Sequence, residues 1–176
     1  MLFKTIFSGF GGQGVLSMGL NLAHAAMLDG KNVTFLPSYG AEVRGGTANC
    51  TVAISEEEIA SPVASSPDFL VAMNRPSLIR FQNQIQSGGL FFINSSLVDV
   101  EISRGDVDII EVPANKIAEG LGNLKCANIV MLGAYIKKSN IVSLDSQIKG
   151  IENSFKKKEK LITLNKKALL SGYELF

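Results

Sequence analysis

The residues best suited to chemistry lie in a glycine-rich turn that directly follows an apolar run near the amino terminus. The turn has the spacing G-x-G-x-x-G and supplies the candidate cofactor-binding residues Gly9, Gly11, Gly12, Gln13 and Gly14. Glycine lets a phosphate approach the backbone, and the first N–H groups of a helix carry a partial positive charge. We therefore expect a site for an anionic group here. The structural alternative is a tight strand-to-helix turn that only allows close packing.

A second polar segment, residues 38–46, follows the next apolar run. It supplies the further candidates Ser38, Tyr39, Gly40, Glu42, Arg44, Gly45 and Gly46. The segment lies beyond the carboxyl end of a predicted strand, where open α/β sheets bind ligands. The guanidinium of Arg44 can bind a phosphate or carboxylate through two hydrogen bonds. The alternative is a surface ion pair between Glu42 and Arg44, which would contribute little energy.

The nicotinamide-binding interpretation of the glycine turn lacks one expected residue. In such sites an acidic residue at the end of the second strand, about 20 positions after the glycines, binds the ribose hydroxyls. Here the second strand ends in Leu36, Pro37 and Ser38, and Asp29 precedes that strand. A free-standing dinucleotide-binding protein and a structural interaction module both stay open as hypotheses.

Alternating strands and helices must position the two segments. Apolar runs predict strands at 3–8, 32–37, 68–73, 88–96 and 107–113, and residues 47–55 alternate as a half-exposed, antiparallel strand would. Helices are predicted from residue 15 to about 29, near 76–86 and from Pro113 onward. An amphipathic helix is predicted over 127–139, and further helices over 143–155 and 158–175. This order favours a three-layer α/β fold with a mostly parallel sheet, at least one antiparallel strand and a Rossmann-like start. Residues 1–176 are expected to form one domain.

The first predicted helix is apolar on nearly every side. It should therefore be buried on more than one face and form a βαβ unit with the strands before and after it. His24, the one histidine, is expected to be a core residue of this helix. Cys50 should act as a small apolar residue of its strand. Asn74 either faces a ligand at a strand end or caps the helix that follows.

Composition disfavours several function classes. Hydrophobic residues make up 46% of the chain, charged residues 19%, and the net charge is +1, so no nucleic-acid footprint is indicated. Few charges are typical of a subunit whose exterior is partly buried against partners, although a large single core would also produce this composition. Two cysteines, Cys50 and Cys126, are too few for an iron–sulfur cluster, and no metal-ligand spacing is present. Without a signal-peptide pattern or a run of about 20 apolar residues, we expect a cytoplasmic protein without membrane contact.

Four segments, in this order and spacing, resemble the gamma subunit of the 2-oxoacid:ferredoxin oxidoreductases. They are GFGGQGV, LPSYGAEVRGGTANC, ISEEEIASP and PDFLVAMNRPS. The form SYGAEVRGG is more similar to the 2-oxoglutarate and 2-oxoisovalerate types than to the pyruvate type. The resemblance covers nearly the whole chain and identifies it as a family member by sequence.

The resemblance implies a share in an enzyme that is inactive without its partners. The complex would oxidatively decarboxylate a 2-oxoacid such as 2-oxoglutarate to an acyl-CoA, using thiamine diphosphate, Mg²⁺ and iron–sulfur clusters to reduce ferredoxin. Alpha and beta subunits, with a ferredoxin-like delta subunit in some members, would hold those cofactors, and this chain would bind none alone. It would contribute to coenzyme A binding and active-site closure through residues 9–14 and 38–46. Asp106 follows Gly105 but lacks the next glycine of a thiamine-type metal motif, so we expect no ligand there.

Overall fold

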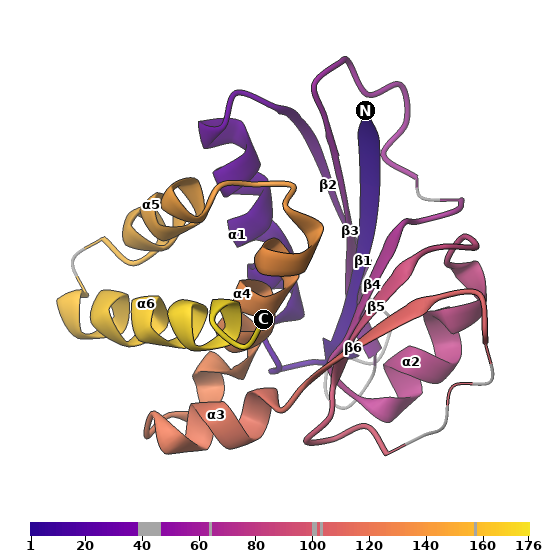
Figure 1. The fold of residues 1–176 in the computed structure, drawn as a ribbon. Helices are drawn as coiled ribbons and strands as arrows, with labels where there is room; N and C mark the ends of the chain where they lie inside the picture. The colour runs from indigo at the N-terminus through magenta and orange to yellow at the C-terminus, as the bar shows by residue number, and fades with distance from the viewer. Residues whose placement is uncertain (39–46, 64, 100–101, 103, 157) are drawn as a thin grey trace.

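A computed structural model describes residues 1–38, 47–63, 65–99, 102, 104–156 and 158–176. Its centre is a mixed sheet of six strands in the order β2-β3-β1-β4-β5-β6 (Figure 1). In chain order the strands are β1 (Leu2–Phe10), β2 (Asn32–Ser38), β3 (Thr47–Ser55), β4 (Phe69–Ala72), β5 (Leu90–Asn94) and β6 (Asp108–Val112). Strands β1, β4, β5 and β6 pair in parallel, and β3 is antiparallel to both of its neighbours. The predicted strands and the antiparallel direction of β3 are confirmed.

The expected βαβ unit differs in one respect. Strands β1 and β2 run in the same direction, because each pairs antiparallel with β3, but β3 lies between them. The register of β3 extends from Leu2↔Ser55 to Phe10↔Thr47 on β1, and from Asn32↔Ser55 to Ser38↔Asn49 on β2. With a strand on each side, β3 is more buried than predicted, and Val52 and Ala53 are fully buried. Alternating polarity predicted a half-exposed strand, and that part of the prediction was wrong.

Helices cover both faces of the sheet and form the outer two layers (Figure 1). One face carries α1 (Val15–Leu28), α3 (Ala114–Gly120), α4 (Ala127–Ser139), α5 (Leu144–Ser154) and α6 (Glu159–Tyr173). The other carries α2 (Arg75–Phe81), which continues as a short 3₁₀ turn, Gln82–Gln84; a second such turn, Leu124–Cys126, leads into α4. Alternation along the strands separates two cores, with Phe7, Val71 and Phe92 on the α4 side and Ile6, Leu70 and Phe91 on the α2 side. The three-layer α/β fold is confirmed.

Helix α4 is the centre of the larger core. Every residue from Ala127 to Ile136 is buried, so the prediction of an amphipathic helix was wrong for this stretch. Its Tyr135 is fully buried among aromatic rings, and its hydroxyl shares a 2.6 Å hydrogen bond with Thr5 of β1. Helix α6 covers the far side through two glycines: a Cβ added to Gly133 would touch the carbonyl of Leu169, and one added to Gly172 would touch the carbonyl of Val130. The two backbones are therefore in direct contact.

Helix α1 is buried on most sides, as predicted, but one stripe faces solvent. The stripe comprises Ser17, Leu20, His24, Met27 and Leu28, which recur every three or four residues. The prediction that His24 is a core residue was therefore wrong. Cys50 of β3 is fully buried against α1, and burial raises the pKa of its thiol to about 12, which confirms its apolar role. Within the described residues, no helix combines the length and apolar character that spanning a bilayer requires.

Candidate functional site

The glycine turn connects the carboxyl end of β1 to α1. Gly12 and Gly14 have φ angles of 95° and 73°, a left-handed conformation that side chains with a Cβ rarely adopt. Gly9 lies within β1, and a Cβ there would come within 2.8 Å of Gln13 Oε1 and 3.0 Å of Met73 Cβ. The geometry is thus that of a tight strand-to-helix turn with close packing, which was the alternative to an anion site. That tightness leaves the anion-site hypothesis open, because the same conformation brings bare backbone to the surface.

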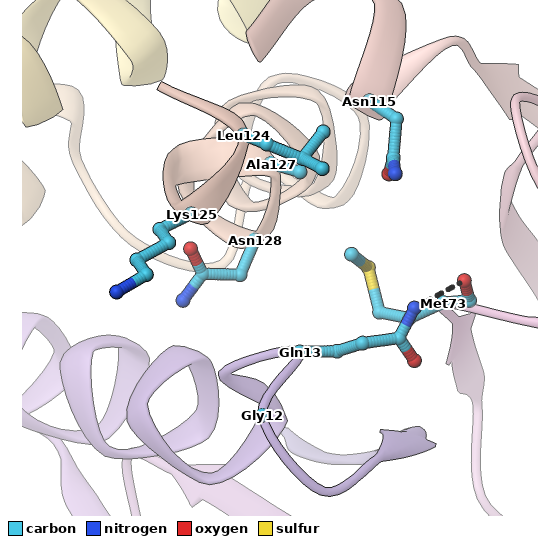
Figure 2. Close-up of a pocket in the computed structure, with 8 residues that line it drawn as sticks. All are labelled: Gly12, Gln13, Met73, Asn115, Leu124, Lys125, Ala127 and Asn128. Atoms are coloured by element: carbon cyan, nitrogen blue, oxygen red, sulfur yellow. Dashed lines mark hydrogen bonds between the residues drawn. The ribbon is translucent and has the colours of Figure 1, made fainter. Parts of the chain in front are cut away.

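The side chain of Gln13 is held in place by hydrogen bonds to three neighbouring residues. Its Oε1 accepts hydrogen bonds from the backbone N–H of Phe10 at 2.7 Å and from Nδ2 of Asn74 at 2.8 Å. Its Nε2 donates to the carbonyl of Met73 at 3.3 Å, as the dashed line in Figure 2 shows. The side chain therefore joins the glycine turn to the carboxyl end of β4.

Three asparagines extend this amide network across neighbouring strand ends. Oδ1 of Asn74 accepts from the backbone N–H of Ser77 at 2.9 Å, so the predicted helix-capping role is confirmed for α2. Nδ2 of Asn94 donates to the carbonyl of Met73 at 3.3 Å and to Oδ1 of Asn115 at 2.8 Å. Oδ1 of Asn94 is buried without a hydrogen-bond partner among the described residues. Sequence reasoning missed Asn94 and Asn115; a polar residue that ends an apolar strand was the available signal for the first.

A pocket of about 280 Å³ opens between the glycine turn and the start of α4 (Figure 2). Its lining consists of Gly12, Gln13, Met73, Asn115, Leu124, Lys125, Ala127 and Asn128. Asn128 fixes the opposite wall to the turn, because its Nδ2 donates to the carbonyl of Gly14 at 3.1 Å. A Cβ on Gly14 would lie 2.5 Å from that nitrogen, so glycine is required here by contact as well as by conformation. Asn128 and Lys125 also belong to a lining that the sequence did not suggest.

A second pocket of about 280 Å³ continues from the first along α1. The two share Lys125 and Asn128, and the second extends to the apolar side chains of Phe155, Leu161 and Leu164. A third hollow, of about 290 Å³, lies on the other side of the turn, against Phe10, Leu16 and Ala48. The glycine turn is therefore bordered by open space on two sides.

The electrostatics of the first pocket favour an anionic or neutral ligand. No acidic side chain belongs to its lining, and Lys125 has no carboxylate partner among the described residues. Helices α1 and α4 both begin at this pocket, so two helix N-termini contribute partial positive charge. Burial raises the pKa of the Cys126 thiol, whose Sγ donates to the carbonyl of Asn123. That cysteine is protonated at neutral pH and supplies no nucleophile.

Of the second predicted segment, residues 38–46, the structure describes Ser38 and then Thr47, which directly follows the segment. Ser38 ends β2 in register with Asn49 and is exposed, and Thr47 begins β3 opposite Phe10 of the glycine turn. Both ends therefore lie at the same edge of the sheet as the turn. The remaining candidates lie outside the described residues; they are Tyr39, Gly40, Glu42, Arg44, Gly45 and Gly46.

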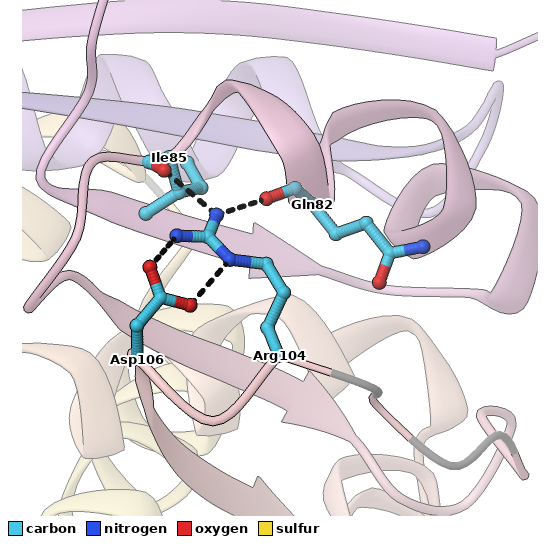
Figure 3. Close-up of polar contacts among 4 residues, drawn as sticks. All are labelled: Gln82, Ile85, Arg104 and Asp106. Carbon is cyan, nitrogen blue, oxygen red and sulfur yellow. Dashed lines mark hydrogen bonds and ion pairs between the residues drawn. The ribbon is translucent and has the colours of Figure 1, made fainter.

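Asp106 lies at the opposite, amino end of the parallel strands (Figure 3). The guanidinium of Arg104 donates to Asp106 from Nε at 2.9 Å and from Nη2 at 2.6 Å. The same group donates from Nη1 to the carbonyls of Gln82 and Ile85, both at 2.7 Å. Arg104 lowers the pKa of Asp106 to about 2. The carboxylate serves an ion pair rather than a metal.

The described residues do not fit a metal ion or an iron–sulfur cluster. No three histidine, cysteine, aspartate or glutamate side chains gather in that part of the chain. Cys50 and Cys126 are both buried, the first in β3 and the second at the start of α4. Any such group would have to be held outside the residues described.

Fold and site together define an α/β domain, with a strand–glycine turn–helix connection beside a pocket that has no acidic side chain. Residues 4–175 match the family described as pyruvate ferredoxin/flavodoxin oxidoreductase. The chain therefore belongs to this family, as its four sequence segments predicted.

Three similar proteins place the chain more closely. It is 43% identical over 169 residues to the ketoisovalerate oxidoreductase subunit VorA of Methanothermobacter thermautotrophicus, and the match covers 95% of the chain and 35% of that subunit. The gamma subunit of a keto/oxoacid ferredoxin oxidoreductase from Geobacter sulfurreducens superposes with a TM-score of 0.84 at 30% identity, covering 98% and 96% of the two chains. A third similar structure is a 2-oxoglutarate:ferredoxin oxidoreductase from Magnetococcus marinus, solved with 2-oxoglutarate, coenzyme A and succinyl-CoA bound. It superposes with a TM-score of 0.91 at 25% identity, and the match covers 99% of this chain and 31% of the Magnetococcus chain.

The covered shares differ in an informative way. The chain spans about a third of the length of the ketoisovalerate oxidoreductase subunits and of the Magnetococcus chain, but nearly all of the Geobacter gamma subunit. The same domain therefore occurs both as a separate subunit and as part of a longer polypeptide.

Proposed function

We propose that the chain is the gamma subunit of a 2-oxoacid:ferredoxin oxidoreductase and that it binds coenzyme A. Residues 1–176 act as one domain, and the substrate is of the 2-oxoglutarate or 2-oxoisovalerate type. Alpha and beta subunits, and in some assemblies a ferredoxin-like delta subunit, supply the catalytic centre. The observation that carries the proposal is the pocket without acidic side chains, where two helix N-termini and Lys125 meet the glycine turn.

The chemistry of coenzyme A suits this pocket in two ways. Its phosphates are anionic, and the ammonium group of Lys125 and the N-terminus of α1 offer positive charge. Its pantetheine arm is uncharged and carries two amides, which need hydrogen-bond donors and acceptors. Among the described contacts, Nδ2 of Asn115 and Oδ1 of Asn128 have no partner, and both residues line the pocket. This chain would thus bind and orient coenzyme A without supplying a group that reacts.

Thiamine diphosphate, Mg²⁺ and iron–sulfur clusters belong to the partner subunits in this proposal. Thiamine diphosphate supplies the decarboxylation chemistry, and the clusters pass the released electrons to ferredoxin. The described residues of this chain form no group of three histidine, cysteine, aspartate or glutamate side chains that could hold a metal ion. The residues of this chain would hold coenzyme A, which accepts the acyl group, and would limit the access of water to the reacting centre.

Free-standing dinucleotide binding receives less support from the fold. In dinucleotide-binding sheets the second strand carries the ribose-binding acid beside the first strand. Here β3 separates β2 from β1, and β2 ends in Leu36, Pro37 and Ser38. A ribose bound at the glycine turn would meet no carboxylate from that strand.

Substitution of the cations tests the proposal. In the assembled complex, Lys125→Ala and Arg44→Ala should each raise the KM for coenzyme A about tenfold, because each removes a charge-assisted contact to phosphate of about 1.4 kcal/mol. Ferredoxin reduction measured at saturating coenzyme A should change less. Lys167→Ala, at an exposed position on α6, is the matched control. Equal losses in both measurements, or unchanged kinetics, for Lys125→Ala would contradict the assignment of coenzyme A to this pocket.

A further inference from the structure

The exposed face of α1 differs from every other exposed helix face in the described chain. Leu20, Met27 and Leu28 are 42%, 63% and 49% exposed, and no lysine, arginine, aspartate or glutamate occurs between Val15 and Leu28. The other α-helices all expose charged side chains; examples are Arg80 on α2, Glu119 on α3, Lys137 on α4, Lys149 on α5 and Lys167 on α6. A solvated helix normally carries charges on its outer face. The outer face of α1 therefore has the composition of a covered surface.

Packing within the chain leaves this face open. On one side of α1, a Cβ at Gly19 would meet Cys50 and Phe35, so that side lies on β2 and β3. On another side, Gly150 of α5 lies close to the backbone of Asn21 and Ala25. The exposed stripe lies between these contacts, at the edge of the molecule where β2 ends the sheet. No described element of the chain covers it.

The stripe is continuous with the proposed coenzyme A site. Helix α1 starts at Val15, directly after Gly14, and Ser17 of the stripe lines the second pocket. That pocket shares Lys125 and Asn128 with the proposed coenzyme A pocket. A partner that brings a thiamine-dependent centre to the turn must therefore lie next to this end of α1. The longer relatives show how large that partner is, because this domain makes up only 31% of the Magnetococcus chain and 35% of the VorA subunit.

We infer that the exposed face of α1 is the docking surface for the subunit equivalent to the remaining two thirds of those longer chains. This face is formed by Ser17, Leu20, His24, Met27 and Leu28. The inference rests on the proposed function. A helix of 14 residues is about 21 Å long, and a strip about 10 Å wide along it covers about 200 Å². A stable interface buries about 800 Å² on each partner. The contact therefore extends from α1 onto the glycine turn, and the partner surface that meets α1 is uncharged and apolar.

Charged substitutions on α1 test the docking surface. The full-length chain, carrying Leu20→Lys or Met27→Lys, is mixed with the remaining purified subunits of its complex, and the dissociation constant is measured by titration. Each substitution should weaken binding at least tenfold, because it places an ammonium group in an apolar contact. Ile79→Lys on α2, at a position 51% exposed on the opposite face, should bind as the unmodified chain does. Thermal unfolding of each variant confirms that the fold is kept.

Hydrogen exchange of the unmodified complex provides a second readout that needs no variant. Amides of α1 and of residues 9–14 should be protected on assembly, while those of α2 should not change. If the unmodified chain binds and the α1 variants bind equally well, the surface assignment is wrong and the subunit assignment stands. If the unmodified chain fails to bind at all, the proposed function fails with it. A homodimer that Leu20→Lys dissociates would assign the stripe to a second copy and overturn the inference.

Discussion

At the amino ends of the parallel strands, charged groups bind the connecting segments, whereas neutral amides gather at the carboxyl ends. Arg104 makes four hydrogen bonds at the amino end, and Asp68 accepts from the backbone N–H of Lys4 at 2.7 Å and from Nε2 of Gln86 at 2.6 Å. At the carboxyl end, Oδ1 of Asn94 and Oγ of Ser8 are buried, and neither has a hydrogen-bond partner in the part of the chain that the structure describes. Buried polar atoms are normally hydrogen-bonded. The amino end is therefore built for stability, and the carboxyl end keeps hydrogen-bonding capacity beside a pocket.

The largest expected effect lies at the carboxyl end and would sharpen the comparison. Gly14→Ala should lower the free energy of unfolding by about 2 to 3 kcal/mol, because it combines a left-handed backbone with the clash against Asn128. Gly30→Ala is the control: it has φ of 76° but no atom within 4 Å of an added Cβ, so it should cost about 1 kcal/mol. Urea unfolding of both variants measures the difference. Equal losses would show that Asn128 does not fix the turn.

A second pair of substitutions compares the two ends directly. Asp68→Ala should cost about 1.5 to 3 kcal/mol, because it removes two hydrogen bonds to a charged group. Asn94→Leu should cost less than about 1 kcal/mol, since it also removes an acceptor that lacks a partner. The carbonyl of Met73 would still accept from Gln13. Denaturant unfolding at neutral pH tests both, and a larger loss for Asn94→Leu would break the comparison.

The smallest effect is a pH dependence at the amino end. The pKa of Asp106 is about 2 in the folded chain, against an ordinary value of 3.8, because Arg104 stabilises the carboxylate. This stabilisation is complete above pH 3.8 and is lost as the pH falls towards 2. Asp106→Asn should therefore flatten the fall in melting temperature between about pH 4 and pH 2. A variant with the same acid profile as the unmodified chain would show that the ion pair does not contribute.

Sequence reasoning located the elements well but could not order them. Apolar runs bounded by glycine and proline predicted each strand, because burial alone determines them. Nothing local shows that β3 lies between β1 and β2, since strand order depends on pairings between distant segments. The exposed residues of α1 recur with helical spacing, but most of them are apolar, so the sequence predicted a helix buried on nearly all sides. For this reason His24 was wrongly predicted to be buried.

The candidate site was predicted from one side only. The glycines of residues 9–14 were evident from their spacing, but the opposite wall is not adjacent in sequence: Asn128 meets Gly14 across 114 positions. Gln13 was predicted as a ligand-binding residue, and the structure shows that its side chain joins the turn to Met73 and Asn74 through hydrogen bonds. A sequence motif indicates local conformation. A pocket also needs an opposite wall, and residues distant in sequence form that wall only when the chain folds.

The glycine contacts between α4 and α6 have a consequence for ligand selection. Gly133 is five residues beyond Asn128, about 7.5 Å along the helix axis, and its lack of a side chain lets α4 rest on the backbone of α6. A methyl group at that point would push the two axes apart and shift the start of α4 relative to the glycine turn. The width of the cavity, and hence the size of molecule it admits, should therefore respond to substitution of Gly133, a residue outside the pocket lining.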